Sequence, residues 1–181
     1  MNAKELLLTR RSIRSFKDEV VSKEVMNEIL DLTRYAPSWT NSQTARYTLI
    51  NNKDIINKIA DECVKGFIYN AETLKQAKNI CVISYVAGKS GSLQKIGSND
   101  GNTNKWEVFD SGIATLQFCL AAHEKNVGTV IMGIIDEDKI AKVIDLPEGE
   151  KVSVLIVYGY ANGDHPQAPL RKDIEIISRF L

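Results

Sequence analysis

The spacing of apolar residues along the chain alternates between the 3.6-residue period of a helix and the short continuous runs of a buried strand. In residues 23–36, for example, Met26, Ile29 and Leu30 fall on one helical face. Residues 79–86 are apolar at nearly every position, which is typical of a strand buried on both faces. The same reasoning predicts helices over 3–9, 23–36, 53–65, 70–77, 106–126, 137–144 and 173–180, and strands over 47–50, 79–86, 128–135 and 152–160.

The longest predicted helix, 106–126, carries apolar residues almost all the way round. A helix of this kind is buried at the centre of a fold or in a contact between subunits. One small sheet cannot easily cover so much apolar surface, so we predict that two copies of the chain form an obligate or near-obligate dimer.

Particular residue types at the predicted helix ends support these boundaries. Ser22 and Asp136 are suited to cap helix N-termini, and Pro37 disfavours helical backbone in the residue before it. Asn126 or Gly128 can end helix 106–126, because both residue types tolerate the left-handed conformation.

Two polar stretches are predicted to be loops, where binding groups often lie. Residues 37–44 are rich in hydroxyl and amide side chains, and they form either a binding loop or a plain connector. Residues 88–104 contain four glycines among Ser, Asn and Asp, which predicts a lid over a site or local disorder. These glycines do not have the spacing of a phosphate-binding loop.

Composition narrows the classes of function. Lys and Arg total 23, as do Asp and Glu, and this formal net charge of zero argues against a nucleic-acid binder or a membrane-surface binder. No run of 18 or more apolar residues is present to span a bilayer, and the N-terminus lacks the pattern of a signal peptide. We therefore expect a single cytoplasmic domain over residues 1–181.

The cysteines and histidines do not have the spacing of a metal site. Cys63, Cys81 and Cys119 are far apart and lie in apolar surroundings, which predicts buried free thiols in a reducing compartment. His123 and His165 share no ligand spacing with them. We expect His123 to be structural or solvent-facing rather than catalytic.

Candidate chemistry is concentrated in residues 10–16, Arg-Arg-Ser-Ile-Arg-Ser-Phe. Arg donates paired hydrogen bonds that match a phosphate, and Ser12 adds a neutral donor. The alternative is a solvated basic helix end, because cations are favoured near a helix C-terminus. Arg171 and Lys172 precede the last predicted helix, where two cations are unfavourable unless an anion is present, and this favours an anion site.

Four motifs follow one another along the chain. They are 10–16, Ala36-Pro37-Ser38-Trp39-Thr40-Asn41-Ser42-Gln43, Asp110-Ser111-Gly112-Ile113-Ala114 with 128–133, and Gly159-Tyr160 with Pro169 and Arg171. Together they resemble the nitroreductase family of FMN-dependent oxidoreductases, and the likeness covers nearly the whole chain. The resemblance implies an α+β fold with a mostly antiparallel central sheet flanked by helices, and a homodimer with two FMN sites at its interface.

The resemblance also implies an FMN site built from three parts of the chain. The phosphate and ribityl chain would be held by polar side chains near the two ends of the sequence: Arg10, Arg11, Ser12, Arg14 and Arg171. The other subunit would supply a loop: Pro37, Ser38, Trp39 and Asn41. The isoalloxazine would lie against a strand that offers backbone N–H groups to its N5 edge: Ile131, Met132 and Gly133.

The implied activity is hydride transfer from NAD(P)H, through FMN, to an electron-poor acceptor such as a nitroaromatic or a quinone. The scheme would be ping-pong, with the oxidant entering the face that NAD(P)H has left. Flavin supplies the redox chemistry, so no catalytic side chain is expected. The sequence contains no ribose-recognition motif that would favour NADH or NADPH.

Two departures from the family pattern favour other functions. Ala45 stands where an aromatic residue is common, and neither Ile131 nor Met132 is acidic, as some members are there. These differences favour a non-catalytic protein of the same fold that binds or stores flavin. The third candidate is an anion-binding regulatory domain without flavin.

Overall fold

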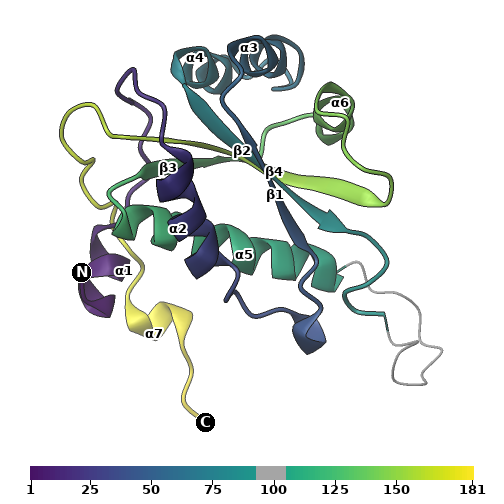
Figure 1. The fold of residues 1–181 in the computed structure, drawn as a ribbon. Helices are drawn as coiled ribbons and strands as arrows, with labels where there is room; N and C mark the ends of the chain where they lie inside the picture. The colour runs from purple at the N-terminus through teal and green to yellow at the C-terminus, as the bar shows by residue number, and fades with distance from the viewer. Residues whose placement is uncertain (93–104) are drawn as a thin grey trace.

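The computed structural model, which describes residues 1–92 and 105–181, contains a four-stranded sheet between two layers of helices (Figure 1). The strand order is β1 (Ala45–Ile50), β2 (Asn79–Val86), β4 (Glu150–Gly159) and β3 (Gly128–Met132). Every neighbouring pair is antiparallel. The predicted α+β architecture with an antiparallel central sheet is therefore confirmed.

Helices cover both faces of this sheet (Figure 1). One face packs against α3 (Lys53–Glu62), α4 (Ile68–Gln76) and α6 (Glu137–Val143). The other face packs against α2 (Lys23–Thr33) and α5 (Lys105–Glu124). The central strands are thus buried from two sides, as their continuous apolar sequences require.

Strand β2 shows how the two cores are divided. Ile80 and Val82 belong to the core beneath α3, α4 and α6, whereas Cys81 and Ile83 belong to the core beneath α2 and α5. This alternation follows from the two-residue period of a strand. The predicted burial of the three cysteines as free thiols is confirmed.

Helix α5 is buried on one side only. Phe118 and Ala122 pack beneath the sheet with no exposed surface, but the side chains of Phe109 and Leu116 are 57% and 51% exposed. The predicted all-round apolar helix is therefore present, and a single chain leaves one of its apolar faces uncovered.

Several element ends differ from the prediction for tertiary reasons. Helix α2 ends at Thr33, three residues early, and strand β3 ends at Met132 rather than at 135. Beyond β3, the Asp136 N–H donates to the Cys63 carbonyl at 2.6 Å and turns the chain toward α3. The last helix, α7, covers only Ile174–Ile177, because its residues have no packing surface to extend it.

Smaller corrections apply to the other predicted ends. Strand β1 begins two residues early at Ala45, and α4 begins at Ile68 rather than at 70. The predicted caps are present: the Ser22 and Asp136 side chains accept from the first turns of α2 and α6, and Asn126 has a positive φ of 58° after α5. Most of the predicted lid lies outside the described residues, in 93–104.

The basic segment 10–16 lies along the outer edge of the sheet, directly after α1 (Ala3–Thr9). Ser12 pairs with Thr129 of β3, and the Ile13 N–H donates to the Thr129 carbonyl at 2.9 Å. A further bridge joins Phe16 to Ala161 after β4. These contacts fix the segment against the sheet.

Two glycines make this contact possible. Gly128 and Gly159 are partners across β3 and β4. A Cβ on Gly128 would lie 2.7 Å from Cγ1 of Ile13, and a Cβ on Gly159 would lie 3.2 Å from Cδ1 of Phe16. The glycine pair therefore receives the two apolar side chains that seat the basic segment.

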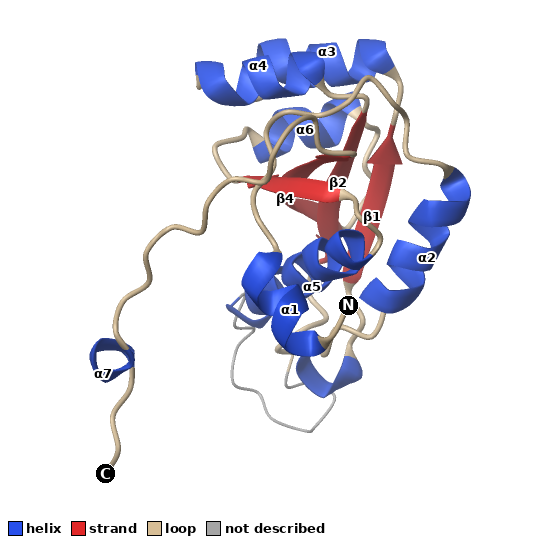
Figure 2. Cartoon of the chain, turned by 90° about the vertical axis from the view of Figure 1, so that its left-hand side faces the viewer, coloured by secondary structure: helices blue, strands red, loops and turns tan. Residues whose placement is uncertain are grey.

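Residues after 166 extend away from the body of the fold as a tail that carries α7 (Figure 2). Its apolar side chains are open to solvent, with Leu170 99% and Phe180 94% exposed. In one chain the tail therefore has no core of its own.

Gly128→Ala tests the seating of the basic segment. The new Cβ would lie 2.9 Å from Cβ of Ile13, so no rotamer change relieves the overlap. We expect the free energy of unfolding to fall by about 1–3 kcal/mol, the usual cost of overpacking. The control is Gly133→Ala, whose Cβ meets no heavy atom within 4 Å. Equal melting temperatures of the two apo variants would contradict this account.

Candidate functional site

Three polar side chains of the basic segment share one side. The backbone at Arg10 is extended, with φ −58° and ψ 129°, and Ser12 pairs with β3. Side chains alternate along such a segment, so Arg10, Ser12 and Arg14 lie opposite Ile13, which is buried. Arg14 is exposed, and Arg10 and Ser12 are half-buried. The structure thus brings together two guanidiniums and a hydroxyl at the sheet edge.

Arg11 is engaged elsewhere. Its Nη1 donates to the carbonyls of Leu8 and Arg10 at 2.8 Å each, which satisfies the C-terminal end of α1. It lines a hollow of about 440 Å³ together with His123 and His165. The structure therefore places one end of the Arg11 guanidinium against the last carbonyls of α1, beside Arg10.

His123 links α1 to the C-terminal end of α5. Its Nε2 lies 2.8 Å from the Thr9 hydroxyl. Burial lowers the pKa of His123, and the nearby charges of His165, Arg10 and Arg11 lower it further. This contact joins the end of α1 to the end of α5, and the expectation that His123 is structural or solvent-facing stays a prediction.

Beside the basic segment, β3 ends in an accessible stretch of backbone. Ile131 is 46% exposed on an otherwise buried strand, and a Cβ on Gly133 would meet nothing within 4 Å. Because β3 is at the edge of the described sheet, a flat group can approach its outer backbone groups beyond Thr129. Met132 is buried and faces the core.

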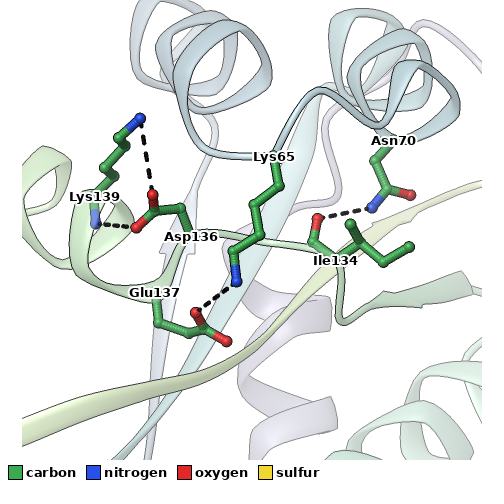
Figure 3. A network of polar contacts seen from close by, with 6 residues as sticks. All are labelled: Lys65, Asn70, Ile134, Asp136, Glu137 and Lys139. Carbon is green, nitrogen blue, oxygen red and sulfur yellow. Dashed lines mark hydrogen bonds and ion pairs between the residues drawn. The ribbon is translucent and has the colours of Figure 1, made fainter.

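The chain after β3 is held by contacts that the sequence did not predict. The Asn70 side-chain amide donates to the Ile134 carbonyl at 3.3 Å, next to the Asp136–Cys63 backbone bond. These two bonds tie the residues after Gly133 to the end of α3 and to the first turn of α4. Figure 3 shows the Asn70 bond with the exposed contacts Lys65–Glu137 and Lys139–Asp136, which contribute little to stability.

The predicted loop lies at the other end of α5. Trp39–Asn41 form a 3₁₀ turn, and the Trp39 N–H donates to Asp110 Oδ1 at 3.0 Å. Pro37 and Asn41 are exposed at its surface, while Ser38 and Trp39 are half-buried. Asp110 itself was not predicted to anchor the loop, although a carboxylate within an apolar helix was a signal.

Within one chain, the two parts of the predicted site are far apart. Asp110 holds the loop, and His123 holds the end of α1 that leads into the basic segment. The two residues are thirteen positions apart on α5. At 1.5 Å per residue, this separation is about 20 Å. The two parts of the predicted site, called half-sites below, are therefore held near opposite ends of one helix.

Comparison with known proteins decides the family. The model of the nitroreductase family matches residues 7–160. The chain belongs to the nitroreductase family. The match includes the basic segment, the loop and the end of β3, and it stops before the tail.

Individual nitroreductase relatives are distant in sequence. A protein of Methanothermobacter thermautotrophicus, whose name provisionally assigns it as an NADH dehydrogenase/NAD(P)H nitroreductase, is 28% identical over 164 residues, which are 88% of this chain and 78% of that protein. A nitroreductase family protein from Streptococcus pneumoniae TIGR4 has a TM-score of 0.85 at 16% identity, with 99% of this chain and all of that chain covered. The NADPH:FMN oxidoreductase of Vibrio harveyi, solved with NAD+, has a TM-score of 0.79 at 20% identity, with 98% of this chain and 76% of that chain covered.

The remaining predicted site residue, Arg171, lies on the exposed tail. Its Nη1 donates to the carbonyls of Pro169 and Leu170, its own neighbours in the chain.

Among the described residues, no helix is long and apolar enough to cross a membrane. Within 1–92 and 105–181 there is also no group of three or more His, Cys, Asp or Glu placed to hold a metal ion.

Proposed function

We propose that the chain is an FMN-dependent oxidoreductase that takes a hydride from NAD(P)H. The observation that carries this proposal is the alignment of Arg10, Ser12 and Arg14 on one side of the sheet edge, next to the open backbone at Gly133. Two guanidiniums and a hydroxyl suit a phosphate, and exposed backbone suits a flat ring. The names of the Methanothermobacter and Vibrio proteins support the same reading.

The residues present fit FMN in this arrangement. Arg10, Ser12 and Arg14 would hold the phosphate and the ribityl chain, and residues 131–133 would orient the isoalloxazine edge through backbone N–H groups. FMN, when bound, supplies the hydride-accepting and hydride-donating chemistry. The chain's own contribution is to bind and orient, and an open flavin face suits ping-pong transfer to a nitroaromatic or quinone.

We also propose that the working protein is a homodimer. The two half-sites lie about 20 Å apart along α5, so Pro37, Ser38, Trp39 and Asn41 would serve the flavin of a second copy. The uncovered apolar side of α5 and the unpacked tail both need a partner surface. A partner that orders the tail would also bring Arg171 toward a phosphate. The three buried thiols suit the cytoplasm.

Replacing Arg10 tests flavin binding. Arg10→Ala removes a charged hydrogen bond to phosphate and should cost about 1.5–3 kcal/mol of FMN affinity. Arg10→Lys keeps the charge and should cost less. FMN titration followed by flavin fluorescence measures the affinity of both variants. Wild-type affinity in both would mean that Arg10 is a solvated charge and not a phosphate ligand.

Mixed dimers test whether the site is shared. Arg10→Ala and Asn41→Gly chains, each with a different affinity tag, are co-expressed and the mixed dimer is purified through both tags. Glycine adopts the positive φ of 56° at position 41 without strain and removes the Asn side chain with its amide. If the loop acts on the partner's flavin, one site carries both changes and the other carries neither. We expect each homodimer to bind FMN weakly and the mixed dimer to regain one tight site of two.

No recovery in the mixed dimer would mean that loop and basic segment act within one chain. The parental homodimers, purified through the same two-tag procedure, are the control for subunit exchange.

A flavin-storing protein of the same fold is the competing candidate, favoured by the absence of an acid at Ile131 and Met132. Stopped-flow mixing of the FMN-loaded protein with NADH or NADPH separates the two. In an oxidoreductase, the nucleotide reduces the flavin on the time scale of turnover and the visible absorbance of the flavin falls. The absorbance returns when an added quinone oxidises the flavin. Flavin that stays oxidised with both nucleotides would favour storage.

A further inference from the structure

Asp110 is a buried carboxylate that joins three separate segments of the chain. It is 3% exposed, on the side of α5 that meets the loop. The Trp39 N–H donates to Oδ1 at 3.0 Å and to Oδ2 at 3.1 Å, and the Ser42 hydroxyl donates to Oδ2 at 3.2 Å. The Ser90 hydroxyl, from the turn after β2, donates to Oδ2 at 2.6 Å. A carboxylate accepts all of these bonds without offering a competing donor.

The loop that Asp110 holds does not have a conformation that its residues prefer. Thr40 and Gln43 have φ of 44° and 49°, in the left-handed region that disfavours most side chains, and Asn41, a residue type that tolerates this region, has a φ of 56°. Three local bonds close the turn on itself: the Gln43 N–H donates to the Ser38 hydroxyl at 2.9 Å, the Asn41 N–H to the Ser38 carbonyl at 2.9 Å and the Ser42 N–H to the Trp39 carbonyl at 2.8 Å. Such backbone persists only where surrounding contacts determine it, and Asp110 provides those contacts from α5.

We propose that Asp110 is a positioning residue for the flavin site. This inference rests on the proposed function, in which residues 37–41 contact the flavin held by the partner. Asp110 lies beneath the loop and acts through Trp39 and Ser42, so it sets the loop's position without touching the flavin. The site on one chain thus depends on a carboxylate buried in the other.

Glu107 offers a matched control on the same helix. It is also buried, at 1% exposure, and it accepts a hydrogen bond from the Gly88 N–H. Glu107→Gln and Asp110→Asn each remove one buried negative charge from the first half of α5. Of the two carboxylates, Asp110 is the one that accepts hydrogen bonds from the loop.

The experiment measures FMN affinity of full-length Asp110→Asn and Glu107→Gln dimers, with near-UV circular dichroism to confirm folding. Asn keeps one acceptor oxygen where the carboxylate has two, and it removes the charge that strengthens the bonds from the Trp39 N–H and the Ser42 hydroxyl, so the hold on the loop weakens. We expect the Kd for FMN to rise about tenfold in Asp110→Asn, which corresponds to roughly 1.4 kcal/mol. Glu107→Gln should change the Kd for FMN by no more than about threefold, because Glu107 bonds to the Gly88 N–H rather than to the loop.

A mixed dimer of Asp110→Asn with Arg10→Ala supplies a readout that a purely structural role would not give. If Asp110 acts on the partner's flavin, this pair regains one tight site of two. If Asp110 only stabilises its own chain, the basic segment of that chain is damaged as well and no tight site returns. A tight FMN site in the mixed dimer of Asp110→Asn with Arg10→Ala supports the inference. The inference is overturned if this dimer has no tight site while the mixed dimer of Asn41→Gly with Arg10→Ala has one.

If Arg10→Ala regains no tight FMN site with either Asp110→Asn or Asn41→Gly, the flavin site is not shared between chains. The inference then fails together with the proposal of a shared site. A wild-type protein that takes up no FMN overturns the function itself.

Should Asp110→Asn fail to fold, Ser42→Ala and Ser90→Ala replace it. The inference then requires weaker FMN binding in Ser42→Ala, which loses a loop bond, than in Ser90→Ala, which keeps both loop bonds. Equal binding in these two variants would overturn it.

Discussion

The packing of α5 across the sheet is the constraint on which both half-sites depend. Its buried side fixes the helix beneath β2 and β4, and its two ends then hold different parts of the chain. Asp110 holds the loop before β1, while His123 holds the segment that leads to Arg10. The distance between the half-sites is therefore set by the length of a rigid helix rather than by flexible loops.

The glycine pair at the edge of the sheet completes this arrangement. Gly128 and Gly159 leave space for Ile13 and Phe16, so an extended segment can lie flat against β3. Extended backbone then directs alternate side chains outward, where their charge is available to an anion. Because Gly128 and Gly159 have no side chains, Ile13 and Phe16 can pack against the sheet. This packing determines where the charged side chains of the basic segment are presented.

The parts of this structure that are predictable from sequence are those determined by local patterns. The burial of β2 and the apolar surface of α5 follow directly from their residues, and the family motifs located the basic segment and the loop. Element ends were less predictable, because contacts such as Asp136–Cys63 end β3 through residues distant in sequence. The same reason hid the anchoring role of Asp110, since its donors are twenty or more residues away.

The central claim is that two chains together build each flavin site, so flavin binding and dimer formation must be linked. The direct measurement is sedimentation velocity of the FMN-loaded protein over a dilution series, with detection at the flavin absorbance and at 280 nm. The account predicts one FMN per chain in the dimer, with flavin lost from the sedimenting boundary as monomer appears and with a tighter dimer in excess FMN. A monomer that sediments with its flavin still bound would contradict it.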